Sequence, residues 1–167
     1  MNGWAAEMAQ LAAEFTRDFE ATQGFEPGDN YVSLADDRAR RAAVQAGGFL
    51  PAPLSDFYGV VGEVSLPDVH YGFFVASVES LVQGAGEVHP TKVVGAIEGD
   101  IVVFGTNGGG DLIAMATDGR VYIMGGGSLL GRVYDVEEDG IKAAFRDLAE
   151  FLAFLKGHMR DARADLQ

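Results

Sequence analysis

The sequence contains no cysteine and only 12 Lys and Arg residues among 167. Without cysteine the chain forms no disulfide, has no thiolate nucleophile and offers no thiolate ligand to a metal, which fits a reducing compartment. The 12 bases stand against 25 Asp and Glu residues, so the net charge at pH 7 is −13. Nucleic acids and anionic membrane surfaces are bound through Lys and Arg, so this charge argues against both as partners.

Long apolar runs are also missing. No uninterrupted apolar stretch approaches the ~18 residues that a membrane span needs. The N-terminal sequence MNGWAAEMAQ lacks the basic region and the following apolar region of a secretory signal. We therefore expect a cytoplasmic protein.

What is present is the composition of one globular domain, with 48% hydrophobic and 22% charged residues. This balance is far from the low hydrophobicity and high charge of disordered chains. A domain of 167 residues buries well over half of the surface that its unfolded chain exposes. Folding therefore requires neither a metal nor a disulfide.

Helical periodicity marks the N-terminal part of the chain. Apolar residues spaced by three or four form one stripe over residues 4–19, and Glu7 and Glu14 fall between them, facing water. Ser33, with Asp36 three residues later, resembles the N-cap of a second, Ala- and Arg-rich helix. These segments predict a helical N-terminal region.

The C-terminal part carries the strongest helical stripe. Apolar residues recur every three or four positions over 141–159, and Leu148 and Leu152 lie in the middle of this pattern. The acidic run 135–139 would then lie near the helix N-terminus, where the helix dipole favours negative charge. We expect this helix to pack on a sheet and to be essential for folding.

Short β-favouring runs separated by Gly, Asp and Pro fill the chain from about residue 60 to residue 136. Two of them, 101–104 and 121–124, are apolar at both odd and even positions, which indicates central strands covered on both faces. A short helix over 77–83 is predicted between the strands, with Ser77 as its cap. The predicted fold class is α+β, with a central, mostly antiparallel sheet of about six strands flanked by N-terminal and C-terminal helices. The candidate strands are VGEVSL, GFFVAS, KVVGAI, IVVFG, DLIAMAT, RVYIM and GRVYDV.

The negative charge is concentrated in residues 51–140, which hold 13 acids and three bases, a net charge of −10. Such a field would raise the encounter rate with a basic partner, and salt would weaken it. The simpler interpretation is that the charge keeps the protein soluble. Charge alone does not decide between the two.

The glycine-rich segments match no nucleotide-binding or hydrolase motif. A P-loop needs glycine directly before its lysine, whereas Thr91 precedes Lys92. A dinucleotide-binding pattern that starts at Gly84-Ala85-Gly86 has His89 in place of its third glycine. A second dinucleotide-binding pattern, which starts at Gly125, has Leu130 in place of its third glycine. Leu130 also stands in place of the closing glycine of a nucleophile elbow that starts at Gly126.

One glycine-rich segment has a structural interpretation instead. It lies between two apolar strands, where a tight hairpin turn needs the positive φ that Gly and Asn adopt at little cost. The predicted turn residues are Asn107, Gly108, Gly109 and Gly110.

Two histidines pair with acids in the sequence. Asp68 and His70 are two residues apart, as are Glu87 and His89, so each pair would face the same way on a strand and be able to ligate a metal. The pairs leave open a small metal-dependent enzyme or a small-molecule sensor. Both lie beside proline in loop-like sequence, which favours ordinary surface histidines, and His158, in the last turn of the predicted C-terminal helix, is interpreted as structural. We therefore predict no catalytic residues, no metal and no cofactor.

The middle and the end of the chain together resemble the SUKH superfamily. In that family a strand leads into a Gly-rich turn that ends in Gly-Asp, two strands follow, and the C-terminal helix carries a Phe-Leu pair. The resemblance covers about two thirds of the chain and divides it into a helical N-terminal extension (1–50) packed on the core, a SUKH-like α+β core (51–160) and a tail (161–167). The matching positions are Gly109, Gly110, Asp111, Asp118, Gly119, Val121, Phe151 and Leu152.

The resemblance implies a protein-binding function without catalytic residues. Bacterial members resemble immunity proteins that bind and neutralise a toxin, whereas fungal members resemble signalling scaffolds. A toxin that cuts nucleic acid has a basic cleft for phosphate, so an acidic surface would fit it. We expect a protein partner, namely a basic toxin domain, and neither nucleic acid nor membrane. The candidate partner-binding residues are Asp111, Asp118, Glu137, Glu138 and Asp139.

Overall fold

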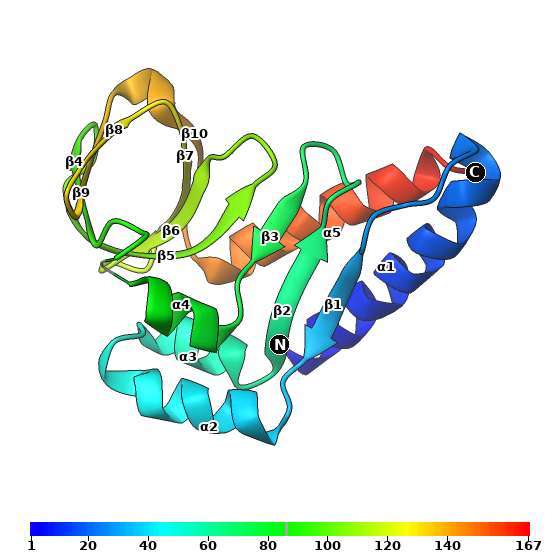
Figure 1. Cartoon of the computed structure of the whole chain (residues 1–167), viewed down its shortest axis with the longest axis horizontal. Helices are drawn as coiled ribbons and strands as arrows, with labels where there is room; N and C mark the ends of the chain where they lie inside the picture. The colour runs from blue at the N-terminus through cyan, green and yellow to red at the C-terminus, as the bar shows by residue number, and fades with distance from the viewer. Residues whose placement is uncertain (86) are drawn as a thin grey trace.

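The computed structural model describes residues 1–85 and 87–167, in which helices predominate towards the two ends and strands in the middle (Figure 1). Gly86, part of the Gly84-Ala85-Gly86 pattern, lies outside the described residues. The helices of the described part are α1 (Asn2–Gln23), α2 (Asp37–Gln45), α3 (Ala52–Tyr58), α4 (Val78–Gly84) and α5 (Leu148–Ala164), with 3-10 helices η1 (Ala46–Gly48) and η2 (Glu138–Gly140). Its strands are β1 (Tyr31–Leu34), β2 (Val61–Leu66), β3 (Phe73–Val75), β4 (Lys92–Gly95), β5 (Gly99–Asn107), β6 (Leu112–Ala116), β7 (Val121–Met124), β8 (Ser128–Leu130), β9 (Val133–Val136) and β10 (Ile141–Phe145).

The predicted α+β fold class is confirmed, with a helix near each end of the chain and a mostly antiparallel sheet. Within the described residues only β4 and β9 pair in parallel. These residues form ten strands where about six were predicted. Three strands are absent from the prediction: β1 lies in the segment predicted as helical, β8 exposes all three of its side chains and so shows no alternation, and β10 lies inside the apparent helical stripe.

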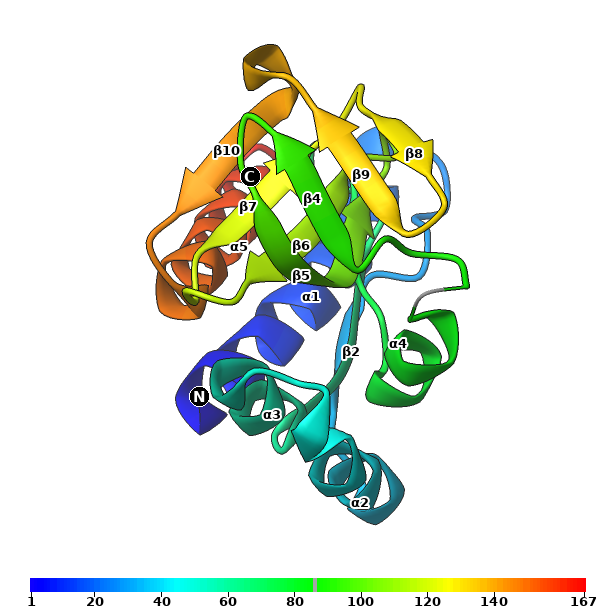
Figure 2. The same cartoon turned by 90° about the vertical axis from the view of Figure 1, so that its left-hand side faces the viewer.

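Strand β5 organises the sheet. It is nine residues long, and its first residues pair with β4 while its last residues pair with β3. Its other edge pairs with β6, which continues into β7 and β10. Figure 2 looks onto β4, β9 and β8, which fold over the sheet of β5, β6 and β7, whereas β3, β2 and β1 extend it in the other direction.

The central strands lie between two hydrophobic cores. Val103 and Tyr122 belong to a smaller core that also contains side chains of β4 and β9. Phe104 and Ile123, their neighbours in sequence, belong to a larger core that contains side chains of α1 and α5. Two-sided burial of these strands, predicted from their apolar residues at both parities, is confirmed.

Helices α1 and α5 lie side by side against the larger core (Figure 1). Trp4 donates a hydrogen bond from Nε1 to the carbonyl oxygen of Leu152 at 2.8 Å. Glu7 binds Lys156 at 3.1 Å and also Arg160. The hydrogen bond from Lys156 lowers the pKa of Glu7. The prediction that Glu7 faces water is therefore wrong, because α5 places its basic face against α1.

Helix α5 is shorter than the predicted helix over 141–159. Residues 141–145 form β10, whose backbone pairs with β7, and the helix begins at Leu148. Asp147 caps it, because its carboxylate accepts a hydrogen bond from the Glu150 amide at 2.9 Å. The acidic run 135–139 therefore precedes a strand and not a helix. The helix extends to Ala164, into the segment 161–167 that was predicted as a tail.

The first 50 residues contain more than helices. Strand β1 pairs with β2, and Ser33 lies in this strand. Asp36 alone caps α2, with its carboxylate accepting from the Ala39 amide at 2.7 Å. Side chains of α1 such as Met8 and Phe15 are part of the larger core, so this segment completes the fold. None of the described helices combines the length and the apolar character that spanning a lipid bilayer requires.

Candidate functional site

The parallel pairing of β4 with β9 gathers carboxylates at one end of the molecule. Gly95 lies opposite Val136, so the segments that follow the two strands leave the sheet at the same end. All five carboxylate side chains there are exposed, and none forms an ion pair with a described Lys or Arg. We call this group the acidic end; its residues are Glu98, Asp135, Glu137, Glu138 and Asp139.

The backbone beneath the acidic end is fixed by hydrogen bonds. The Gly140 amide donates to the Glu137 carbonyl at 3.0 Å, which closes the turn of η2. The Gly125 amide donates to the Gly140 carbonyl at 2.9 Å, and Lys142 Nζ donates to the Asp139 carbonyl, also at 2.9 Å. Lys142 therefore binds the backbone of η2 and not the neighbouring carboxylates.

The predicted partner-binding residues do not form one group. Asp111 lies near the backbone of the acidic end, because its carboxylate is next to Gly125. The Gly125 amide donates a hydrogen bond to the carbonyl of Gly140 in η2. Asp111 is half-buried and accepts a hydrogen bond from Asn107 Nδ2 at 2.8 Å. Asp118 follows β6 while Asp111 precedes it, and a strand of five residues separates them by about 17 Å. Asp118 also pairs with Arg120, at 3.7 Å.

The turn between β5 and β6 holds Asp111 in place. Asn107 Oδ1 accepts hydrogen bonds from the Gly109 amide at 3.0 Å and from the Asp111 amide at 2.9 Å. Gly110 has a φ of 84°, in the left-handed region that glycine adopts without strain. Gly108 lies so close to Tyr71 that a Cβ added to Gly108 would be 2.0 Å from the Tyr71 carbonyl oxygen. The turn thus fixes the position of the Asp111 carboxylate.

Strand β8 adds an apolar edge next to the acidic end. It is the last strand of its path through the sheet, and its Ser128 lies opposite Asp135 of the acidic end. Leu129 and Leu130 are 51% and 72% exposed. An exposed apolar edge strand is a surface on which another chain can pair. Sequence reasoning missed this strand, although the two adjacent leucines after three glycines were visible.

The four residues considered as a metal or acid–base site do not come together. Asp68 is occupied structurally, because its carboxylate accepts from the Gly28 amide at 2.7 Å and from Asn30 Nδ2 at 2.6 Å. His89 lines a pocket of about 250 Å³ beside Glu63, and burial lowers the pKa of its imidazole. Neither Asp68, Glu87 nor His89 joins His70 in any described group of three potential metal ligands.

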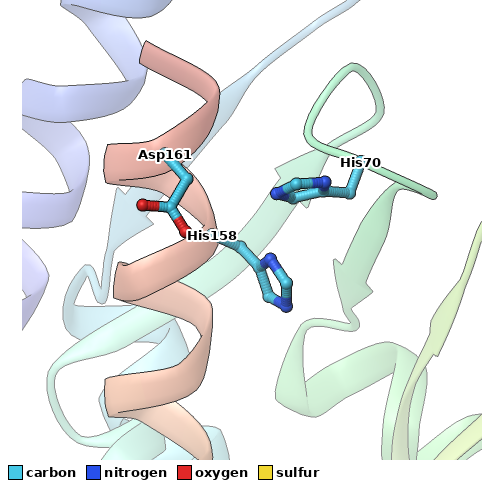
Figure 3. A group of neighbouring side chains, drawn as sticks. All are labelled: His70, His158 and Asp161. Atoms are coloured by element: carbon cyan, nitrogen blue, oxygen red, sulfur yellow. The ribbon is translucent and has the colours of Figure 1, made fainter. Parts of the chain in front are cut away.

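His70 instead meets two residues of α5 (Figure 3). One nitrogen from each of His70 and His158 and one carboxylate oxygen of Asp161 all lie within 4.8 Å of one another. The imidazole rings of the two histidines are 4.3 Å apart. Because α5 extends to Ala164, His158 is not in the last turn as predicted. The signal available in the sequence was the spacing of three between His158 and Asp161, which places them on one helix face.

Comparison with known proteins gives no relative from which to transfer a function. No family model matches the chain, and no curated protein or solved structure is significantly similar to it. The geometry of the acidic end and of the histidine group must therefore carry the functional argument.

Proposed function

We propose that this protein is a binding module of the immunity type, which recognises and neutralises a basic toxin domain through its acidic end. The observation that carries the proposal is the group of five exposed carboxylates without described ion-pair partners, held on a hydrogen-bonded backbone. Unpaired acids at one place repel one another, and a cationic partner would relieve that repulsion.

The physical role of these carboxylates is to steer a partner. Clustered charge of one sign raises association rates by roughly 10- to 1000-fold, and salt screens the effect. A toxin that acts on nucleic acid carries a basic cleft to hold phosphate, so it is the class of toxin that the acidic end would attract. Steering alone gives rate and orientation more than affinity.

Strand β8 would supply the affinity that charge does not. Its outer edge pairs with no other strand of the described residues, and Leu129 and Leu130 supply exposed apolar surface. An apolar anchor beside a charged rim is the usual arrangement of a protein interface.

The resemblance to the SUKH superfamily supports the same proposal. Its matching Phe151 and Leu152 lie in the larger core, and its matching Gly110 and Asp111 form the turn that reaches the acidic end. These residues of the resemblance therefore have identifiable structural roles.

The test uses the product of the reading frame next to this gene as the candidate toxin. Association is followed by stopped-flow fluorescence at low and moderate salt, and toxin activity is measured with and without the protein. The triple variant E137Q/E138Q/D139N should associate about 10-fold more slowly at low salt and should lose most of the salt dependence.

A matched control separates local steering from net charge. The variant E20Q/E26Q/D29N also removes three exposed carboxylates, but from the segment at the end of α1. It should associate nearly as fast as the unmodified protein. Equal slowing by both variants would contradict the acidic end as the binding site. A complex in which the toxin stays active would contradict neutralisation and favour a signalling scaffold.

A further inference from the structure

Three potential metal ligands come together between α5 and the loop that joins β2 to β3 (Figure 3). His158 and Asp161 lie one helical turn apart on α5, and His70 faces them from the loop. Their ligand atoms lie within 4.8 Å of one another. In a tetrahedral zinc site with bonds of about 2.1 Å the ligand atoms are about 3.4 Å apart. His70 and Asp161 are exposed and need only small side-chain rotations to close this difference.

The two residues that precede His70 anchor its loop. Val69 is fully buried, and Asp68 is hydrogen-bonded to Gly28 and Asn30. His70 itself has a φ of 52°, a left-handed conformation that few non-glycine residues adopt. Such a conformation persists only where the surrounding structure imposes it. The loop therefore holds the backbone of His70 in a defined conformation, from which the imidazole faces α5 (Figure 3).

The ring of His158 is fixed by aromatic packing, yet one of its nitrogens lacks a partner. The ring lies 4.2 Å from Phe154 and 5.5 Å from Phe73, measured between centroids. Its Nδ1 is buried and makes no hydrogen bond with any of the residues that the structure describes. A buried imidazole nitrogen without a partner is costly unless a ligand or ion satisfies it. The Nδ1 of His158 therefore points to a bound species, and it does so independently of the clustering of the three side chains.

We propose that His70, His158 and Asp161 bind one divalent transition-metal ion, with Zn²⁺ as the occupant. Two imidazoles and one carboxylate are ligands that zinc prefers, whereas Ca²⁺ and Mg²⁺ select oxygen ligands alone. Three protein ligands leave a coordination position for water or for a group from a partner. The ion would tie the loop before β3 to α5. The site is independent of the acidic end and goes beyond the proposed function.

The test is zinc binding by untagged, full-length protein that has been dialysed against a chelator. Isothermal titration calorimetry with ZnCl₂ at neutral pH should give one site with a dissociation constant of micromolar order or tighter, and Co²⁺ should give a visible absorption band. Zinc should also raise the melting temperature of the protein.

Three variants remove one ligand each. His158→Phe keeps the aromatic packing and removes both nitrogens, and His70→Gln and Asp161→Asn alter exposed residues. Each should weaken zinc binding at least 10-fold, whereas His89→Gln, which alters the half-buried histidine outside the group, should leave it unchanged. Absence of zinc binding at 100-fold excess over micromolar protein would overturn the proposal, as would undiminished binding by the three variants. Partner binding measured on chelator-treated protein tests the acidic end separately.

Discussion

Replacing Leu155 by Ala gives the sharpest test of the packing of α5. Leu155 is fully buried in the larger core, which also contains side chains of α1 and of the sheet. Truncation of a buried leucine loses its transfer free energy and leaves a cavity, which together cost about 3–5 kcal/mol when the neighbours cannot collapse into the space. Collapse is restricted here, because Trp4 and Glu7 tie α1 to α5 along one side. For a domain of this size the same loss lowers the melting temperature by about 6–20 °C.

The assay is urea unfolding followed by far-UV circular dichroism. The midpoint should fall while the slope of the free energy of unfolding against urea stays constant. Leu130→Ala is the matched control, since the same atoms are removed from a side chain that is 72% exposed, and it should change stability by no more than about 0.5 kcal/mol. A cost below about 1 kcal/mol for Leu155→Ala would refute the inference that α5 is tightly packed on the larger core.

Two further predictions concern the backbone and pH. Gly95→Ala should cost roughly 2 kcal/mol or more in urea unfolding, because φ is 100° and the new Cβ would lie 2.3 Å from the Val136 carbonyl oxygen; an unchanged midpoint would show that the pairing of β4 with β9 can shift. Burial is the largest cause that lowers the pKa of His158 below 6.5, and the nearby His70 lowers it further. Asp161 raises the pKa of His158 and so acts in the opposite direction. The unfolded chain therefore takes up the proton first, so stability is complete above about pH 6.5 and falls as pH drops towards the folded pKa. Urea midpoints at pH 7.5 and 5.5 should differ less in His158→Phe than in the unmodified protein, and an equal difference would contradict this linkage.

The sequence predicted the elements whose pattern is unambiguous. Strands β5 and β7 carry apolar residues at both parities and are buried on both faces, and Ser77 caps α4 as its position indicated. The error at β10 has a physical origin. Ile141, Phe145 and Leu148 fit helical spacing, but the backbone of β7 needs a pairing partner there, and this tertiary demand overrides the local pattern.

The candidate sites were less accessible to sequence reasoning. The charge of residues 51–140 indicated an acidic surface, yet only the parallel pairing of β4 with β9 brings the segments that carry Glu98 and Glu137 to the same end of the sheet. His70 was paired with Asp68 because they are neighbours in sequence, whereas its loop turns the ring towards His158. Contacts between a loop and a distant helix depend on the path of the chain, and periodicity contains no information about that path.

The length of β5 has a consequence for how the protein comes apart. One face of this strand contributes Val103 to the smaller core and the other contributes Phe104 to the larger core, so neither core can lose it and remain closed. We therefore expect the two halves of the molecule to unfold together, in a single cooperative transition. A partner that binds the acidic end would consequently slow hydrogen exchange in α1 without contacting that helix.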